Sequence, residues 1–221
     1  MTRDELIAKN IDDWKKKLNG AQICAVTKTM PVADLNAAVR AGADAVGENR
    51  VQELMDKFES IEPGARVHLI GRLQTNKVRY VIGKVHMIQS LDRDALALEI
   101  SKRSAQAGVE TRTLVQVNVA REPQKGGVEP DALFPFLETC AALPGLRVDG
   151  LMAVMPFADD PEDVRPYMRQ MRALFEEAAR AHIHGVHMDV LSMGMSGDCL
   201  VAAEEGSTMV RIGRGIFGSR T

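Results

Sequence analysis

Two glycine-rich turns near the C-terminus carry the clearest chemical signal in this sequence. The first is Ser192-Met193-Gly194-Met195-Ser196-Gly197-Asp198, and the second is Val210-Arg211-Ile212-Gly213-Arg214-Gly215. Small residues let backbone N–H groups approach an anion, and a helix N-terminus adds partial positive charge. In barrels of parallel strands, a phosphate site commonly lies after strands 7 and 8. The two turns therefore predict a site for a phosphorylated small molecule.

Lys28 indicates which phosphorylated molecule this is. It follows the apolar run Ile23–Thr27, at the mouth end of a predicted strand. A lysine held there loses hydration, which favours the neutral amine that can attack an aldehyde and form a Schiff base. An aldehyde-reactive amine opposite a phosphate site suits pyridoxal 5′-phosphate. The alternative is a strand-end lysine whose amine simply reaches water.

Two polar residues have both a binding and a structural interpretation. Arg211 lies two positions before Gly213, so both project to the same side of a strand. Its guanidinium could face the pyridine nitrogen of such a cofactor and keep it unprotonated, or it could pair with a carboxylate such as Glu48. Asn49 could bond the phenolic oxygen of the cofactor, or it could cap a helix that begins near Arg50.

The histidines and cysteines indicate neither a metal site nor a disulfide framework. The three cysteines are far apart, and each falls in a predicted strand or helix: Cys24, Cys140 and Cys199. We predict reduced, structural thiols. Three histidines fall at a helix end and the following loop, without a Cys or carboxylate in ligand register: His182, His184 and His187. We predict no metal there, and we interpret His68 as an interior histidine with satisfied hydrogen bonds.

The elements that position these residues alternate between strand and helix. Apolar, β-branched runs predict eight strands: Ile23–Lys28, Ala45–Asn49, Val67–Gly71, Met87–Leu91, Thr113–Val119, Val148–Val154, Met188–Met193 and Met209–Gly213. Amphipathic patterns predict helices: Arg3–Leu18, Val32–Arg40, Arg50–Ser60, Asp92–Ala107 (with an Asp cap and a stop at Gly108), Asp131–Leu143, Asp163–His182 and Gly197–Glu205. This α/β pattern predicts a single (β/α)8 TIM barrel with an extra N-terminal helix. The alternative, a doubly wound open sheet, lacks its usual GxGxxG signal.

Composition fits one soluble domain over residues 1–221. The 221 residues carry a net charge of −2, which gives no reason to expect nucleic acid. No apolar run approaches the roughly 20 residues that span a bilayer. The charged N-terminus lacks the apolar core of a signal peptide, so we expect a cytoplasmic protein.

Several segments, agreeing in order over nearly the whole chain, resemble the pyridoxal-phosphate homeostasis proteins (YggS/PROSC type). These segments are Val26–Thr29, Val46–Glu53, His68–Lys77, Arg121–Gly127, Gly150–Met152, Ser192–Asp198 and Val210–Gly213. The resemblance implies a barrel like the N-terminal domain of bacterial alanine racemase, binding pyridoxal 5′-phosphate.

The resemblance also assigns residues. Lys28 matches the Schiff-base lysine, Arg211 matches the arginine that faces the pyridine nitrogen, and Asn49 lies in the cofactor-side asparagine motif. The phosphate-binding turns correspond to Ser196, Gly197, Gly213 and Arg214, and Met193 would pack near the ring. The sequence departs from many members at two places, with Met30 in place of Lys and Arg214-Gly215 in place of Thr-Ala.

The resemblance favours a carrier over an enzyme. The racemase uses a tyrosine base from a second domain, whereas this sequence ends after its last barrel segment. Racemisation needs an acid and a base on opposite faces of the cofactor. Tyr80 and Tyr167 fall in predicted helices, away from the polar residues at the ends of the predicted strands. We therefore expect a monomer that stores the cofactor and passes it transiently to apoenzymes.

Lys125 could receive the aldehyde in transit, or it could be a solvated loop lysine. The alternatives are a weak racemase and a Schiff-base aldolase.

Overall fold

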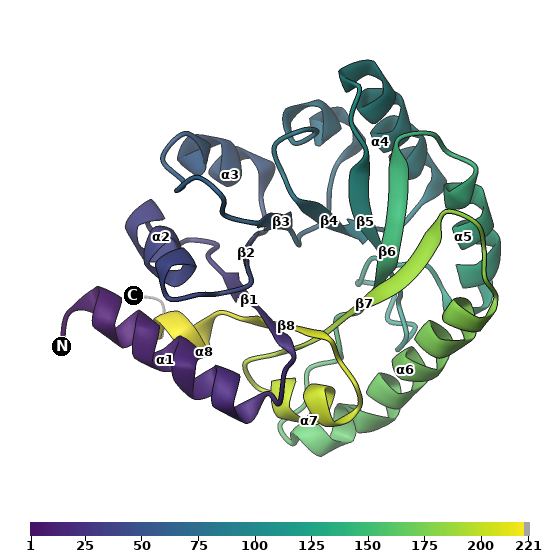
Figure 1. The fold of residues 1–221 in the computed structure, drawn as a ribbon. Coiled ribbons are helices and arrows are strands. Elements are labelled where there is room, and N and C mark those ends of the chain that lie inside the picture. Colours follow the sequence, from purple (N-terminus) through teal and green to yellow (C-terminus); the bar gives the residue numbers. More distant parts are fainter. Residues whose placement is uncertain (219–221) are drawn as a thin grey trace.

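Eight parallel strands close into a barrel in the computed structural model, which describes residues 1–218 (Figure 1). They are β1 (Gln22–Val26), β2 (Ala45–Glu48), β3 (Val67–Leu69), β4 (Met87–Leu91), β5 (Thr111–Gln116), β6 (Leu146–Met152), β7 (Val186–Met195) and β8 (Met209–Ile212). The strands follow chain order around the ring, and β8 closes it by pairing with β1. Each predicted strand is confirmed with ends shifted by a few residues, so the open-sheet alternative is wrong. Residues 219–221 of the predicted domain lie outside the described residues.

Helices cover the outside of this ring (Figure 1). The α-helices are α1 (Arg3–Lys17), α2 (Val32–Arg40), α3 (Val51–Phe58), α4 (Asp94–Ala107), α5 (Leu133–Ala141), α6 (Arg165–Arg180), α7 (Cys199–Glu204) and α8 (Arg214–Phe217). The 3-10 helices are η1 (Thr75–Tyr80), η2 (Pro130–Ala132) and η3 (Pro161–Val164). The sequence patterns placed Tyr80 in a helix but gave no bounds for η1, and they missed α8, because six and four residues are too few for a repeating apolar stripe.

The extra N-terminal helix α1 completes the outer layer where α8 is too short to do so. It lies beside α2 and α8 (Figure 1). A capping box begins it, in which the Glu5 backbone N–H donates to Thr2 Oγ1 at 3.2 Å and the Thr2 N–H donates to the Glu5 carboxylate at 2.7 Å. Ile7 and Ile11 are fully buried in a cluster with residues of β1 and β8. Burying each of these side chains contributes about 1.5–3 kcal/mol.

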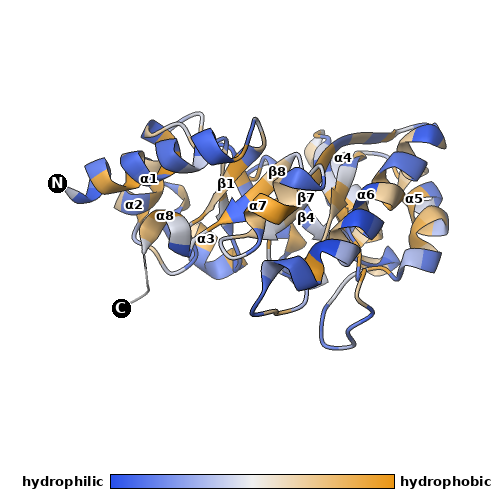
Figure 2. Cartoon of the chain, turned by 90° about the horizontal axis from the view of Figure 1, so that it is seen from below, coloured by the Kyte–Doolittle hydropathy of each residue, from blue (hydrophilic) through white to orange (hydrophobic). Residues whose placement is uncertain are grey.

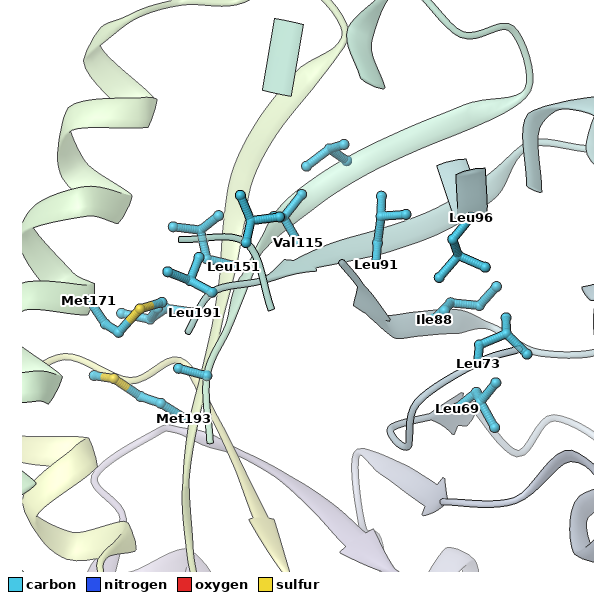
Figure 3. Packing of buried hydrophobic residues seen from close by; sticks show 14 of the residues in the cluster. Leu69, Leu73, Ile88, Leu91, Leu96, Val115, Leu151, Met171, Leu191 and Met193 are labelled. Carbon is cyan, nitrogen blue, oxygen red and sulfur yellow. The ribbon is translucent and has the colours of Figure 1, made fainter. Parts of the chain in front are cut away.

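Apolar side chains cover both faces of the strands. One large cluster packs strand residues such as Leu191 against helix residues such as Met171 (Figure 3). A smaller cluster includes Cys24, Met87 and Met209. Strands such as β8 are accordingly rich in hydrophobic residues, whereas the helices also carry hydrophilic ones (Figure 2). Strands covered on both faces give apolar runs in the sequence rather than strict alternation. A few strand residues are buried and polar instead: His68, Gln89, Ser192 and Arg211.

The predicted Asp cap of the fourth helix is wrong. Helix α4 begins at Asp94, and its N-cap is Arg93, which makes no side-chain cap bond. The Asp92 carboxylate instead accepts a hydrogen bond from the Arg93 guanidinium. The predicted stop is confirmed, because Gly108 adopts φ 64°, the left-handed conformation that commonly ends helices.

The cysteines are free and buried, as predicted. Burial raises the pKa of Cys24 and Cys140 to about 12 and that of Cys199 to about 11, so these thiols are poor nucleophiles. Within residues 1–218, no cluster of three or more His, Cys, Asp or Glu has the arrangement of a metal site. Over the same residues, no helix combines the length and hydrophobicity that crossing a bilayer requires.

Candidate functional site

Lys28 and both glycine-rich turns lie at the same end of the barrel. Lys28 follows β1, Ser196 follows β7 and Gly213 follows β8, all at the carboxyl ends of parallel strands. Lys28 itself is half-buried. The second turn packs on β1, because a Cβ on Gly213 would lie 3.5 Å from the Val26 carbonyl oxygen. The amine and the turns therefore share the face where TIM barrels hold their ligands.

The two turns touch each other. The Gly215 N–H donates to Ser196 Oγ at 3.2 Å, which joins the turn after β7 to the turn after β8. A Cβ built on Gly197 would meet no heavy atom within 4 Å, so open space lies beside the first turn. The Asp198 carboxylate folds back to accept from the Met195 N–H, and Arg214 is exposed. Glycine-rich turns of this kind can present backbone N–H groups to an anion.

Arg211 is a buried cation whose hydrogen-bond acceptors are all neutral. Its side chain donates to the Ser192 carbonyl oxygen (2.8 Å), to Ser192 Oγ (2.6 Å) and to the Ala153 carbonyl oxygen (2.7 Å). The suggested salt bridge with Glu48 is wrong, because Glu48 pairs with Lys57. Burial lowers the pKa of Arg211. A buried guanidinium without a carboxylate partner favours an anionic group nearby.

A cluster of ionised side chains holds the backbone before Lys28. Lys57 Nζ donates to the Thr27 carbonyl oxygen at 3.0 Å and to Glu48 Oε1 at 2.8 Å. Thr27 Oγ1 donates to the same carboxylate oxygen at 2.8 Å. The Glu48 side chain is 0% exposed and that of Lys57 is 12% exposed. Burial raises the pKa of Glu48, and the bonds from Lys57 and Thr27 oppose this rise.

The same cluster holds the backbone after Lys28. The Thr29 N–H donates to the Glu53 carboxylate, which also accepts from Lys57 Nζ at 2.7 Å. Thr29 has φ 65°, a conformation that costs energy for a β-branched residue. Bonds on both sides thus hold Lys28 in a strained turn. We call Glu48, Glu53 and Lys57 the lysine clamp.

Asn49 lies at the end of β2 and does not cap helix α3. The N-cap of α3 is Arg50, and it makes no side-chain cap bond. Asn49 is half-buried and lines a cleft of about 590 Å³. The cleft also contains four basic side chains: Arg50, Arg72, Lys77 and Arg93. A cleft lined this way attracts anions to this end of the barrel.

Comparison with known proteins identifies the family. The alanine racemase N-terminal domain family matches residues 4–221. The chain belongs to this family. It is 46% identical to the pyridoxal phosphate homeostasis protein of Aquifex aeolicus, covering 98% of this chain and 94% of that protein. The resemblance found in the sequence is thereby confirmed.

Solved structures of the family agree with the fold. PipY of Synechococcus elongatus with PLP bound is 30% identical with a TM-score of 0.87, covering 96% of this chain and 100% of that one. The alanine racemase of Corynebacterium glutamicum is 21% identical with a TM-score of 0.79, covering 98% of this chain and 62% of that one. The second likeness concerns the fold alone.

The backbone at Gly71 lies close against that of Asn49, and only a residue without a Cβ allows this approach. A Cβ on Gly71 would lie 2.2 Å from the Asn49 carbonyl oxygen, so the two backbones must separate in Gly71→Ala. We expect this variant to lower the free energy of unfolding by about 1–3 kcal/mol. Urea denaturation of Gly71→Ala beside Gly197→Ala measures the effect, because Gly197 has open space. Equal stability of the two variants would contradict the prediction.

The structure gives the surroundings of two other residues that the sequence analysis named. Contact of Met193 with a cofactor ring stays a prediction, and its side chain is fully buried in the apolar layer that also contains Leu191 and Met171 (Figure 3). Alternation along β7 explains this, since the neighbouring Ser192 is the residue that bonds Arg211. Lys125 is not a freely solvated lysine, because its Nζ donates to the Glu122 carboxylate and to the Met155 carbonyl oxygen (2.9 Å).

The lysine clamp was missed by sequence reasoning. Glu53 and Lys57 are four residues apart on α3, a spacing that predicts an ion pair on a helix surface. That spacing does not show that the pair faces β1 rather than solvent. Glu48 carried the better signal, as a carboxylate inside a predicted strand.

His68 is buried, but its hydrogen bonds are not all satisfied. Nδ1 lies 2.8 Å from Gln89 Nε2, whereas Nε2 has no hydrogen-bond partner among the described residues. The interior placement is therefore confirmed and the satisfied bonding is wrong. Burial lowers the pKa of His68 to about 3, and the nearby His86, Arg112 and Arg66 add to this effect.

This pKa predicts a loss of stability in acid. The unfolded chain binds a proton near pH 6.5 that the folded His68 refuses until about pH 3. The free energy of unfolding should therefore fall by up to about 1.4 kcal/mol per pH unit from pH 6 down to pH 4 through His68 alone. Urea denaturation across this range should show a shallower slope for His68→Gln than for wild type or for the exposed control His184→Gln. Parallel slopes for all three proteins would argue against the low pKa.

Proposed function

We propose that the chain binds pyridoxal 5′-phosphate at the C-terminal end of the barrel and serves vitamin B6 homeostasis by holding, buffering and delivering it. The observation that carries the proposal is Arg211, a buried guanidinium with neutral partners, on the strand between Lys28 and the Ser196 turn. A bound anion would offset the cost of burying that charge. The names of the curated relatives and the PLP-bound PipY structure support the choice of ligand.

Each residue at the mouth has a role in this proposal. Lys28 would hold the cofactor through its Nζ, and pyridoxal 5′-phosphate would supply the aldehyde with which this amine can form a Schiff base. The phosphate would be held by the joined turns: Ser196, Gly197, Gly213 and Arg214. Asn49 would donate to the phenolic oxygen. The lysine clamp would keep the Lys28 amine in one place, so that little ordering is needed on binding.

The same residues favour holding over catalysis. Arg211 is charged at any physiological pH, so facing the pyridine nitrogen it would keep that nitrogen unprotonated and weaken the ring as an electron sink. Tyr80 is 44% exposed on η1, and Tyr167 packs against the outer apolar layer. Within residues 1–218, neither tyrosine lies at a strand end where it could oppose Lys28. Transient contact with apoenzymes, a monomeric state and a cytoplasmic location remain predictions.

Borohydride reduction tests the attachment point. Purified protein incubated with pyridoxal 5′-phosphate and reduced should yield a pyridoxyl group on the peptide that contains Lys28. Modification mainly at Lys125 or at exposed lysines would overturn the assignment.

A separate measurement tests the alternative, a weak amino-acid racemase. Exchange of amino-acid α-protons in deuterated water should stay at the rate of free cofactor. Sustained exchange that disappears in Lys28→Ala would replace the carrier with an enzyme.

A further inference from the structure

The opposite end of the barrel holds a second cavity with charged walls. It has a volume of about 490 Å³ and lies at the N-terminal ends of the strands, away from Lys28. Basic side chains line it on the side of β3 to β5: Arg66, His68, His86 and Arg112. Asp44, before β2, and Asp189, on β7, line it elsewhere.

A chain of hydrogen bonds through the barrel fixes the proton positions at this cavity. Arg211 can only donate, so Ser192 Oγ accepts from it and turns its own hydrogen to Gln89 Oε1 at 2.8 Å. The oxygen of the Gln89 amide is thereby assigned. Its nitrogen donates to His68 Nδ1 at 2.8 Å, so the neutral His68 carries its proton on Nε2.

His68 Nε2–H is therefore a buried donor without an acceptor among the described residues. An unpaired buried donor costs free energy that an acceptor would recover. His86 stacks on the His68 ring with centroids 5.5 Å apart, and its Nε2 accepts from Arg112 at 2.9 Å. Arg112 also pairs with the buried Asp149, which fixes its position. Arg66 is exposed and has no ion pair within residues 1–218.

We propose that this cavity binds a small oxyanion, a carboxylate or phosphate group, held by Arg66, Arg112 and the Nε2–H of His68. Arg66 supplies charge and paired donors, Arg112 supplies the N–H groups that Asp149 and His86 leave open, and the imidazole supplies a donor whose direction the Gln89 bond fixes. Asp44 and Asp189 restrict the choice, because they disfavour a large polyanion. The ligand class is a small metabolite with one or two acidic groups. The chain through Ser192 and Gln89 links this site to Arg211, but the anion proposed here does not require pyridoxal 5′-phosphate to be bound at the other end.

Nuclear magnetic resonance of the histidine side chains tests the site at pH 7.5. Inorganic phosphate is the first probe and malonate is the second, which separates phosphate from carboxylate recognition. Phosphate can also enter the other end of the barrel, so the readout is the local Nε2–H resonance of His68 and the ring signals of His86. At least one probe should shift these signals saturably.

Arg66→Gln is the decisive variant, because Arg66 is exposed and its replacement leaves the fold intact. We expect at least about tenfold weaker binding of the probe in Arg66→Gln and unchanged binding in the control Arg79→Gln, an exposed arginine outside the cavity. His68→Gln should likewise weaken the response of His86. The proposal is overturned if neither probe shifts the His68 signal saturably, which would mean that water alone fills the cavity. It is equally overturned if Arg66→Gln binds as wild type does.

Discussion

Replacing Lys28 with alanine should abolish covalent attachment of pyridoxal 5′-phosphate. In the proposed site, Lys28 is the half-buried amine at the end of β1, held between two bonded backbone positions. Without that amine the cofactor keeps only its phosphate and ring contacts. We expect the imine absorbance band to disappear and the affinity to fall by at least about 100-fold, which corresponds to roughly 3 kcal/mol. Spectroscopic titration and equilibrium dialysis measure the two effects.

Lys125→Ala is the matched control for this variant. Lys125 lies at the same end of the barrel, but its amine is already bonded to Glu122 and to the Met155 carbonyl oxygen. It should therefore keep the imine band and bind the cofactor within about twofold of wild type. If Lys28→Ala retains the band and Lys125→Ala loses it, the two lysines have exchanged roles and the proposed site is wrong.

The fold was predictable because its signals are local. The run Ile23–Val26 is apolar because both faces of β1 are covered, and Gly108 ends α4 because its conformation suits glycine. Elements of one turn have no such pattern, so α8 was missed. Because the short helix α8 was not predicted, the sequence did not show why α1 is needed. The side chains of Ile7 and Ile11 on α1 cover β1 and β8.

The candidate site was predictable only in outline. Strand ends place Lys28 and the two turns on one face, since parallel strands all end on the same side. Side-chain partners are not local. Arg211 could have paired with Glu48 by composition, yet Ser192 and the Ala153 carbonyl lie within its reach instead. Likewise, the unpaired Nε2–H donor of His68 follows from hydrogen bonds of Gln89 and Ser192, which lie on other strands.

Breaking the lysine clamp should destabilise the whole barrel. Lys57→Met leaves the fully buried Glu48 carboxylate without its cation and removes the bond to the Thr27 carbonyl. Such a loss typically costs about 3–5 kcal/mol. Urea denaturation should show this decrease at pH 8. The deficit should shrink toward pH 5, because burial raises the pKa of Glu48 and its neutral form is the less costly one in the fold.

Two further variants separate the buried pair from ordinary ion pairing. Lys16→Met removes an exposed pair with Asp12 and should change stability by less than about 1 kcal/mol. Glu48→Gln combined with Lys57→Met removes both charges and should recover most of the loss. The double variant still lacks the bond to the Thr27 carbonyl, so the backbone before Lys28 is held less firmly. Borohydride trapping at Lys28 should therefore stay slower than in wild type although the fold has recovered. Trapping at the wild-type rate would show that the clamp supports the fold and not the position of the amine.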